Sequence, residues 1–107
     1  MNLKREKCES CEGGVAALTH TEITAFKKQI HPSWKVVDNH RIVKEFSFVN
    51  YQHTMSFVNK IAALAEEEGH HPVLHVYYAK IIIEIWTHAI NGLSGNDFIL
   101  AAKIDGL

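Results

Sequence analysis

Changes in the spacing of apolar residues divide the chain into predicted elements of secondary structure. Apolar positions that recur every three or four residues predict a helix over residues 20–30, which begins at the capping-box pattern Thr19-His20-Thr21-Glu22. A longer apolar stripe predicts a second helix over residues 51–68, with Asn50 as its N-cap and Gly69 just beyond its C-terminus. Each helix therefore has an apolar side that can pack against the rest of the domain.

Shorter stretches of β-forming residues, some of them alternating between apolar and polar, predict strands. They cover residues 34–37, 41–48, 73–78 and 81–88. Turn residues at Asp38-Asn39 separate the first two strands and Ala79-Lys80 separates the last two, so each pair is predicted to form a hairpin. A final helix is predicted to begin at the capping pattern Ser94-Gly95-Asn96-Asp97 and to continue through Ile104.

The order of these elements is α-β-β-α-β-β-α, which predicts the α+β fold class. We expect a four-stranded antiparallel sheet with three helices packed on one face. The other face of the sheet is then available for a ligand or a second subunit. Residues 1–17 are predicted to form an irregular N-terminal arm, and residues 18–107 a single domain.

Composition narrows the class of protein. The chain has 107 residues, of which 47% are hydrophobic and 21% charged, and its formal net charge is −1. These values are typical of a globular domain and exclude a disordered chain or the basic surface of a nucleic-acid binder. No apolar run approaches the roughly 20 residues that cross a bilayer, and the charged N-terminus does not resemble a secretory signal. We therefore expect a cytoplasmic protein with neither a membrane nor a nucleic-acid partner.

The pattern of cysteines and histidines argues against a metal site. Cys8 and Cys11 form half of a zinc site, without a second pair to complete it, and a redox motif would stand between a strand and a helix. We interpret this pair as structurally incidental. Adjacent ligands such as His70 and His71 point apart, and no two histidines share a helical face at His-x-x-x-His spacing. We expect no bound metal.

Histidines are concentrated in one part of the chain. Half of its eight histidines, His70, His71, His75 and His88, lie between residues 70 and 88. Imidazole titrates near neutral pH, so this concentration favours acid–base chemistry. Glu66 stands four residues before His70, about one helical turn away, and is predicted to accept a hydrogen bond from that imidazole and orient it.

The neighbours of these histidines shape the predicted site. Pro72 restricts His71 to extended geometry, and His88 is predicted to end the last strand, where a functional group can project from a rigid scaffold. His75 is interpreted as a residue of the sheet face. The remaining four histidines are interpreted as surface residues, and they are His20, His31, His40 and His53.

Other residues near the cluster have simpler interpretations. Trp34 and Trp86 are interpreted as packing residues, although either could wall a pocket for a flat heterocycle. Asp97 is interpreted as a helix-start residue.

Taken together, these motifs resemble the pterin-4a-carbinolamine dehydratase (4a-hydroxytetrahydrobiopterin dehydratase) family. The resemblance extends from Leu18 to Ile104. Its most specific parts are Glu66-x-x-x-His70-His71-Pro72 and Thr87-His88-x-x-x-Gly92-Leu93-Ser94-x-x-Asp97. Cys8-x-x-Cys11-Glu12-Gly13-Gly14 in the arm also resembles microbial members. Leu74 stands near the position where animal members carry a tryptophan, and Gly69 replaces an acidic residue.

The resemblance implies a hydro-lyase that removes water from 4a-hydroxytetrahydrobiopterin and gives quinonoid dihydropterin. It implies catalysis by His70, His71 and His88 with Glu66 in support, and a pterin pocket that also includes the residues Gly69, Pro72, Trp86, Thr87 and Ala89. It further implies no cofactor and no metal, a homodimer or homotetramer, and a pathway link to an aromatic amino acid hydroxylase. The alternative is a non-catalytic dimeric binding module that regulates a partner protein through its exposed sheet face.

Overall fold

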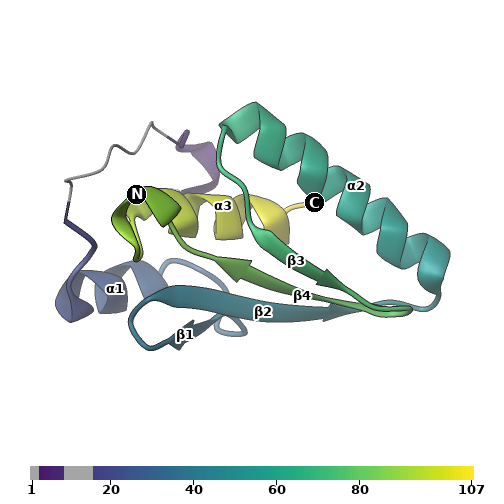
Figure 1. Ribbon diagram of the computed structural model, residues 1–107, viewed down its shortest axis with the longest axis horizontal. Coiled ribbons are helices and arrows are strands. Elements are labelled where there is room, and N and C mark those ends of the chain that lie inside the picture. The colour runs from purple at the N-terminus through teal and green to yellow at the C-terminus, as the bar shows by residue number, and fades with distance from the viewer. Residues whose placement is uncertain (1–2, 9–15) are drawn as a thin grey trace.

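The computed structural model describes residues 3–8 and 16–107, which form an α+β domain (Figure 1). In chain order its elements are the 3-10 helix η1 (Leu3–Arg5), α1 (His20–Lys27), β1 (Lys35–Val37), β2 (Arg41–Ser47), α2 (Tyr51–Glu68), β3 (Val73–Val76), β4 (Lys80–Ile85), the 3-10 helix η2 (His88–Ile90) and α3 (Gly95–Asp105). The predicted order of helices and strands, α-β-β-α-β-β-α, is confirmed by α1–α3 and β1–β4.

The four strands form one antiparallel sheet in the order β1-β2-β4-β3. The two predicted hairpins lie side by side, and β2 pairs with β4 from Ile42 opposite Ile85 to Ser47 opposite Lys80. The turn between β1 and β2 has positive φ angles at Asp38-Asn39, 55° and 51°. Aspartate and asparagine tolerate this backbone conformation better than most residues, which is why the sequence marks a turn here.

One face of the sheet forms the floor of the hydrophobic core. Ile81, Ile83 and Ile85 of β4 are fully buried, whereas the intervening Ile82 and Glu84 are half-buried. Helix α2 contacts both β4 and α3, and α1 contacts α3. The three helices therefore cover the face that carries the buried isoleucines, as the alternation of apolar residues predicts.

Several boundaries differ from those predicted from the sequence. Helix α1 ends at Lys27 rather than at residue 30. Strand β3 ends at Val76, because the backbone N–H of Tyr77 donates to the carbonyl of Lys80 and closes a tight turn. Strand β4 ends at Ile85 and does not reach residue 88. β-forming residues continue beyond both strands, but the backbone there bonds within turns.

The described part of the N-terminal arm is packed against the domain. Helix η1 contacts α3, and both Leu3 and Cys8 are buried. Cys11 lies outside the described residues, so the interpretation of the cysteine pair stays a prediction. Within residues 3–8 and 16–107, no helix combines the length and apolar character that crossing a membrane requires.

Candidate active site

The C-terminus of α2 places the first candidate histidine. Gly69 adopts the left-handed conformation, with φ 66° and ψ 26°, and its N–H donates to the carbonyl of Ala65. The N–H of His70 also donates to Ala65, at 3.2 Å. The predicted end of the helix at Gly69 is confirmed, and His70 is therefore the first residue outside the helical turn.

His70 is paired with a buried aspartate. Its Nε2 lies 2.6 Å from Oδ1 of Asp97 in the first turn of α3, and the two side chains are 12% and 0% exposed. An ionised carboxylate only accepts hydrogen bonds, so Nε2 carries the hydrogen in this contact. The arrangement fixes one tautomer of the imidazole and leaves Nδ1 as its second nitrogen.

The other oxygen of Asp97 is also occupied. Its Oδ2 accepts from the hydroxyl of Thr87 at 2.9 Å and from the backbone N–H of Ser94 at 2.8 Å. The two hydroxyls, of Thr87 and Ser94, lie 2.7 Å apart. Asp97 is therefore both the capping residue predicted from the sequence and the partner of a candidate catalytic histidine.

The predicted contact between Glu66 and His70 is wrong. Oε1 of Glu66 instead lies 2.7 Å from Nε2 of His71, and both side chains are largely exposed, at 80% and 60%. The one-turn spacing rule holds only while the helix continues, and the left-handed Gly69 turns the chain out of the helix before His70. Glu66 and His71 thus form a solvent-exposed pair beside the end of α2.

His88 was predicted to end the last strand, but it is instead the first residue of η2. The backbone of Thr87 pairs with that of Gly92, and this bridge closes a short loop after β4. The exposed imidazole of His88 stacks on the indole of Trp86, with ring centroids 4.4 Å apart and an angle of 7° between the planes. His40 approaches the same indole at 5.4 Å.

The contacts bring some of the predicted site residues together. Asp97 joins His70 to Thr87, and His88 follows Thr87 in the chain. Among the remaining predicted residues, Pro72 is half-buried and Ala89 is exposed on η2. The convergence of all three imidazoles on one cleft stays a prediction.

His75 has the surroundings predicted for a residue of the sheet face. It is exposed on β3, and its Nε2 contacts Oε2 of Glu84 on β4. Arg41 of β2 donates from Nε to the other oxygen of Glu84 at 2.9 Å. The His75 and Arg41 contacts outweigh the opposing effect of burial and hold the pKa of Glu84 below its ordinary value.

Residue patterns alone gave Asp97 no catalytic part. Its only local signal was the capping pattern from Ser94 to Asp97. A capping pattern does not indicate that the carboxylate also contacts a histidine elsewhere in the chain. The contact of His40 with Trp86 was also not predicted, because no sequence motif contains both residues. Among the described residues, no group of three or more histidines, cysteines or acids is arranged to hold a metal ion.

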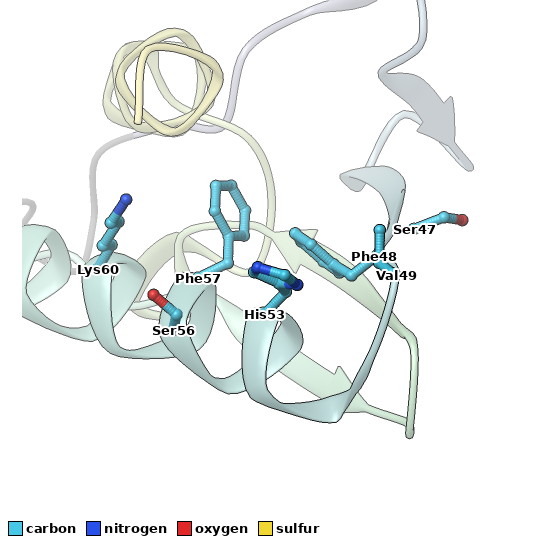
Figure 2. A pocket seen from close by; sticks show the side chains of 7 residues that line it. All are labelled: Ser47, Phe48, Val49, His53, Ser56, Phe57 and Lys60. Carbon is cyan, nitrogen blue, oxygen red and sulfur yellow. The ribbon is translucent and has the colours of Figure 1, made fainter.

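A separate groove lies at the other end of α2, beside the end of β2 (Figure 2). Its volume is about 350 Å³, and it is lined by Ser47, Phe48, Val49, His53, Ser56, Phe57 and Lys60. The rings of Phe48 and Phe57, with centroids 5.3 Å apart, form its apolar part. The groove follows the N-terminal half of α2, whereas His70 follows the C-terminus of that helix.

The fold and this site define a small α+β protein with a histidine anchored by a buried carboxylate. Residues 16–107 match the family model described as Pterin 4 alpha carbinolamine dehydratase, and the chain belongs to this family.

Curated relatives span nearly the whole chain. A protein of Legionella pneumophila (strain Corby) is 49% identical over 99% of this chain and 95% of its own, and one of Alkaliphilus metalliredigens is 42% identical over 97% and 94%. Both carry the provisional name pterin-4-alpha-carbinolamine dehydratase.

Two solved structures are also similar. The transcriptional coactivator/pterin dehydratase from Brucella melitensis has a TM-score of 0.78 and 26% identity, over 84% of this chain and 96% of its own. A pterin dehydratase-like protein identified as a RuBisCO assembly factor in the alpha-carboxysome has a TM-score of 0.61 and 27% identity, over 71% and 89%.

Proposed function

We propose that this protein dehydrates 4a-hydroxytetrahydrobiopterin to quinonoid dihydropterin, with histidines as general acid and base. The observation that carries the proposal is the 2.6 Å contact between His70 and the buried carboxylate of Asp97, in a chain of the pterin carbinolamine dehydratase family. A buried carboxylate that fixes one tautomer of an imidazole is a common way to prepare a general acid or base. No cofactor or metal is needed for this reaction.

The reaction moves two protons and breaks one bond. A general base accepts a proton from N5 of the pterin, the C4a–O bond breaks, and a general acid donates a proton to the departing hydroxyl, which leaves as water while a C4a=N5 double bond forms. We propose that His70 and His88 act on the departing hydroxyl. Asp97 orients His70, a role that the sequence had suggested for Glu66. His71 binds the pterin, with Glu66 as its partner.

The remaining site residues are assigned to the walls of the pterin pocket. Gly69 and Pro72 flank the histidine pair, and Thr87 lies beside Asp97 in the cluster. Trp86 already has an imidazole stacked on it, so we assign it to holding His88 and not to stacking on the pterin. Ala89 lies on the exposed surface of η2 and borders the pocket.

The test is turnover of a 4a-hydroxypterin in an assay coupled to a pterin-dependent hydroxylase, without added metal. His70→Ala and His88→Ala should each lower kcat by about 10²- to 10⁴-fold, because each removes a proton-transfer group. His31→Ala, on an exposed histidine away from this cluster, is the control and should keep the parental rate. Parental turnover by both of the first two variants would show that the roles are wrongly assigned.

We further propose that the protein is a homodimer or homotetramer that works in the cytoplasm and serves an aromatic amino acid hydroxylase. Exposed aromatic and aliphatic side chains at one end of the sheet support an association between subunits. Tyr51 and Tyr78 stack there with centroids 5.9 Å apart, and Val49 is 87% exposed. Light scattering on the purified protein measures the subunit number directly.

The second candidate is a non-catalytic binding module that regulates or assembles a partner protein through its exposed sheet face. The similarity to a structure identified as a RuBisCO assembly factor supports it. The two candidates differ in the coupled assay, because a binding module gives no turnover above the uncatalysed rate. Its binding to the partner protein should be unchanged by His70→Ala and His88→Ala.

A further inference from the structure

The buried carboxylate of Glu68 lies next to the candidate site but takes no part in the proposed proton transfers. Glu68 is the last residue of α2, and its side chain is 2% exposed. Burial of a carboxylate is costly unless hydrogen bonds and an opposite charge replace its lost hydration. The contacts that replace the hydration of Glu68 connect three separate segments of the chain.

Both oxygens of Glu68 are occupied. The backbone N–H of Cys8 donates to Oε1 at 2.9 Å, and the ammonium group of Lys103 donates to Oε2 at 2.8 Å. Burial by itself would raise the pKa of this carboxyl group, but the two donors hold the pKa of Glu68 below its ordinary value. Cys8, Glu68 and Lys103 form what we call the Glu68 joint, which ties the N-terminal arm to α2 and α3.

The Glu68 joint flanks the contact between His70 and Asp97. Glu68 stands two residues before His70, and Lys103 lies on the same helix as Asp97. The thiol of Cys8 also donates to the backbone oxygen of the residue directly before Asp97, at 3.6 Å. The joint therefore fixes the two segments whose side chains meet at the candidate site.

Apart from the joint, the short connection to His70 is held by the backbone hydrogen bonds of Gly69 and His70 to Ala65 and by the contact of His70 with Asp97. Gly69 is exposed, and a Cβ atom placed on it would find no heavy atom within 4 Å beyond its chain neighbours. Glu68 immediately precedes this exposed glycine, so the position of His70 depends in part on where Glu68 is held. A displacement of about 1 Å in an active site can cost about 10²-fold in rate.

We propose that Glu68 is a positioning residue, which acts through Lys103 and the N-terminal arm to hold His70 against Asp97. The inference rests on the proposed function, because it assigns proton transfer to His70. Residues 3–8 then contribute to catalysis, because they help to hold Glu68 and through it His70.

The first test compares two neighbouring carboxylates in the coupled assay. Glu68→Gln keeps the side-chain size and an acceptor for Cys8 but removes the charge that pairs with Lys103. We expect kcat to fall about tenfold or more while KM stays nearly constant, because misplacement of His70 weakens catalysis and not pterin binding. Glu67→Gln, which changes an exposed carboxylate, is the matched control and should keep the parental kcat.

The pairing with Lys103 can be tested from α3. Lys103→Arg keeps the charge and should retain most of the rate, whereas Lys103→Met should reproduce the loss seen in Glu68→Gln. The double variant Glu68→Gln/Lys103→Met should be no slower than either single one, because both changes break the same contact. Lys103→Met also keeps the proposal testable if Glu68→Gln does not fold.

A second readout needs no turnover. The ¹⁵N chemical shifts of the His70 ring report its tautomer and its hydrogen bond to Asp97, and the rate at which a thiol reagent labels Cys8 in a Cys11→Ser background reports docking of the arm. In Glu68→Gln we expect the His70 signals to move and Cys8 to react faster. Glu67→Gln should leave both at parental values.

The outcomes separate this inference from the proposed function. Unchanged His70 signals and Cys8 labelling in Glu68→Gln overturn the positioning role, whatever the activity of the parent. Moved signals with a parental kcat also overturn it. If the parent protein does not turn over a 4a-hydroxypterin but the His70 signals move, the proposed function fails and the mechanical role of Glu68 is supported.

Discussion

Asp97 uses its two carboxylate oxygens for different purposes. Oδ2 accepts from the backbone of Ser94 at the start of α3 and from the hydroxyl of Thr87, while Oδ1 contacts His70. The side chain is fully buried, so each of these donors replaces lost hydration. A single residue therefore couples the start of a helix to the orientation of a candidate catalytic imidazole.

At this scale we predict that Asp97→Asn separates catalysis from folding. The amide can still accept from the backbone of Ser94, but its NH₂ group cannot accept a hydrogen from Nε2 of His70, so the imidazole is driven to the other tautomer. We expect kcat to fall by about 10²- to 10⁴-fold with the fold retained, as measured by the coupled assay and circular dichroism.

Ser94→Ala is the control for the capping role, because it keeps the backbone N–H that contacts Asp97. We expect it to cost about 1 kcal/mol of unfolding free energy or less while kcat changes little. An equal loss of kcat in Ser94→Ala and Asp97→Asn would mean that Asp97 acts on the site only by supporting α3.

Among the elements, the two ends of α2, which local chemistry marks, were predicted more accurately than the end of β4, which was inferred from alternation. Helix α2 begins after Asn50, whose side chain accepts from the backbone of His53, and ends at Gly69. Strand β4, by contrast, was predicted to continue to His88 because residues 81–88 were assigned alternately to the two faces of a sheet. Its end is set by the pairing of Thr87 with Gly92, which periodicity does not contain.

At this scale we predict that Gly69→Ala destabilises the protein through backbone strain alone. Gly69 has φ 66°, and no heavy atom beyond its chain neighbours would touch an added Cβ. A left-handed conformation costs an L-residue about 1 kcal/mol, and urea unfolding should show a loss of that size.

Gly95→Ala is the matched control, since Gly95 is the first residue of α3 and an added Cβ would make only an ordinary contact, 3.4 Å from Phe26. It should leave the unfolding free energy nearly unchanged or slightly raised. A loss in Gly95→Ala as large as in Gly69→Ala would contradict the assignment of the effect to φ.

Across the whole molecule, the N-terminal arm, α2 and α3 meet at Glu68, and two groups at this meeting point titrate abnormally. The pKa of Glu68 is lowered, so its contribution to stability is present above the ordinary carboxyl value of 4.5 and is lost as pH falls through the lowered value. Burial, together with repulsion by Glu68, raises the pKa of Cys8 from 9.0 to about 12. That contribution is complete below pH 9.0 and is lost as pH rises toward 12.

We therefore predict that raising the pH above 9.0 destabilises the parent protein partly through Cys8. The unfolded chain releases the thiol proton before the folded one does, which favours unfolding over this range. Urea unfolding measured from pH 7 upward should give a steeper alkaline loss in the parent than in Cys8→Ala. The pH-independent cost of removing the sulfur does not affect this comparison of slopes. Parallel curves would show that Cys8 is exposed to solvent in the folded protein.

The sequence by itself determined the helices, the strands, their order and the family resemblance, because caps, turns and hydrophobic periods act over about one turn or one hairpin. It also drew attention to His70, His71 and His88, which stand close together in the chain. It could not supply the partner of His70, since a spacing rule favoured Glu66 whereas Asp97, 27 residues away, makes the contact.

Only the tertiary structure decided which distant segments meet. It pairs β2 with β4 and places Asp97 in contact with His70. It also lets the backbone N–H of Cys8 donate to Glu68, 60 residues away in the chain. Such contacts depend on how the helices pack over the sheet as a whole, because the interior must be filled and each buried charge must find donors. No short stretch of residues can determine whether that condition is met, because it depends on the packing of the whole chain.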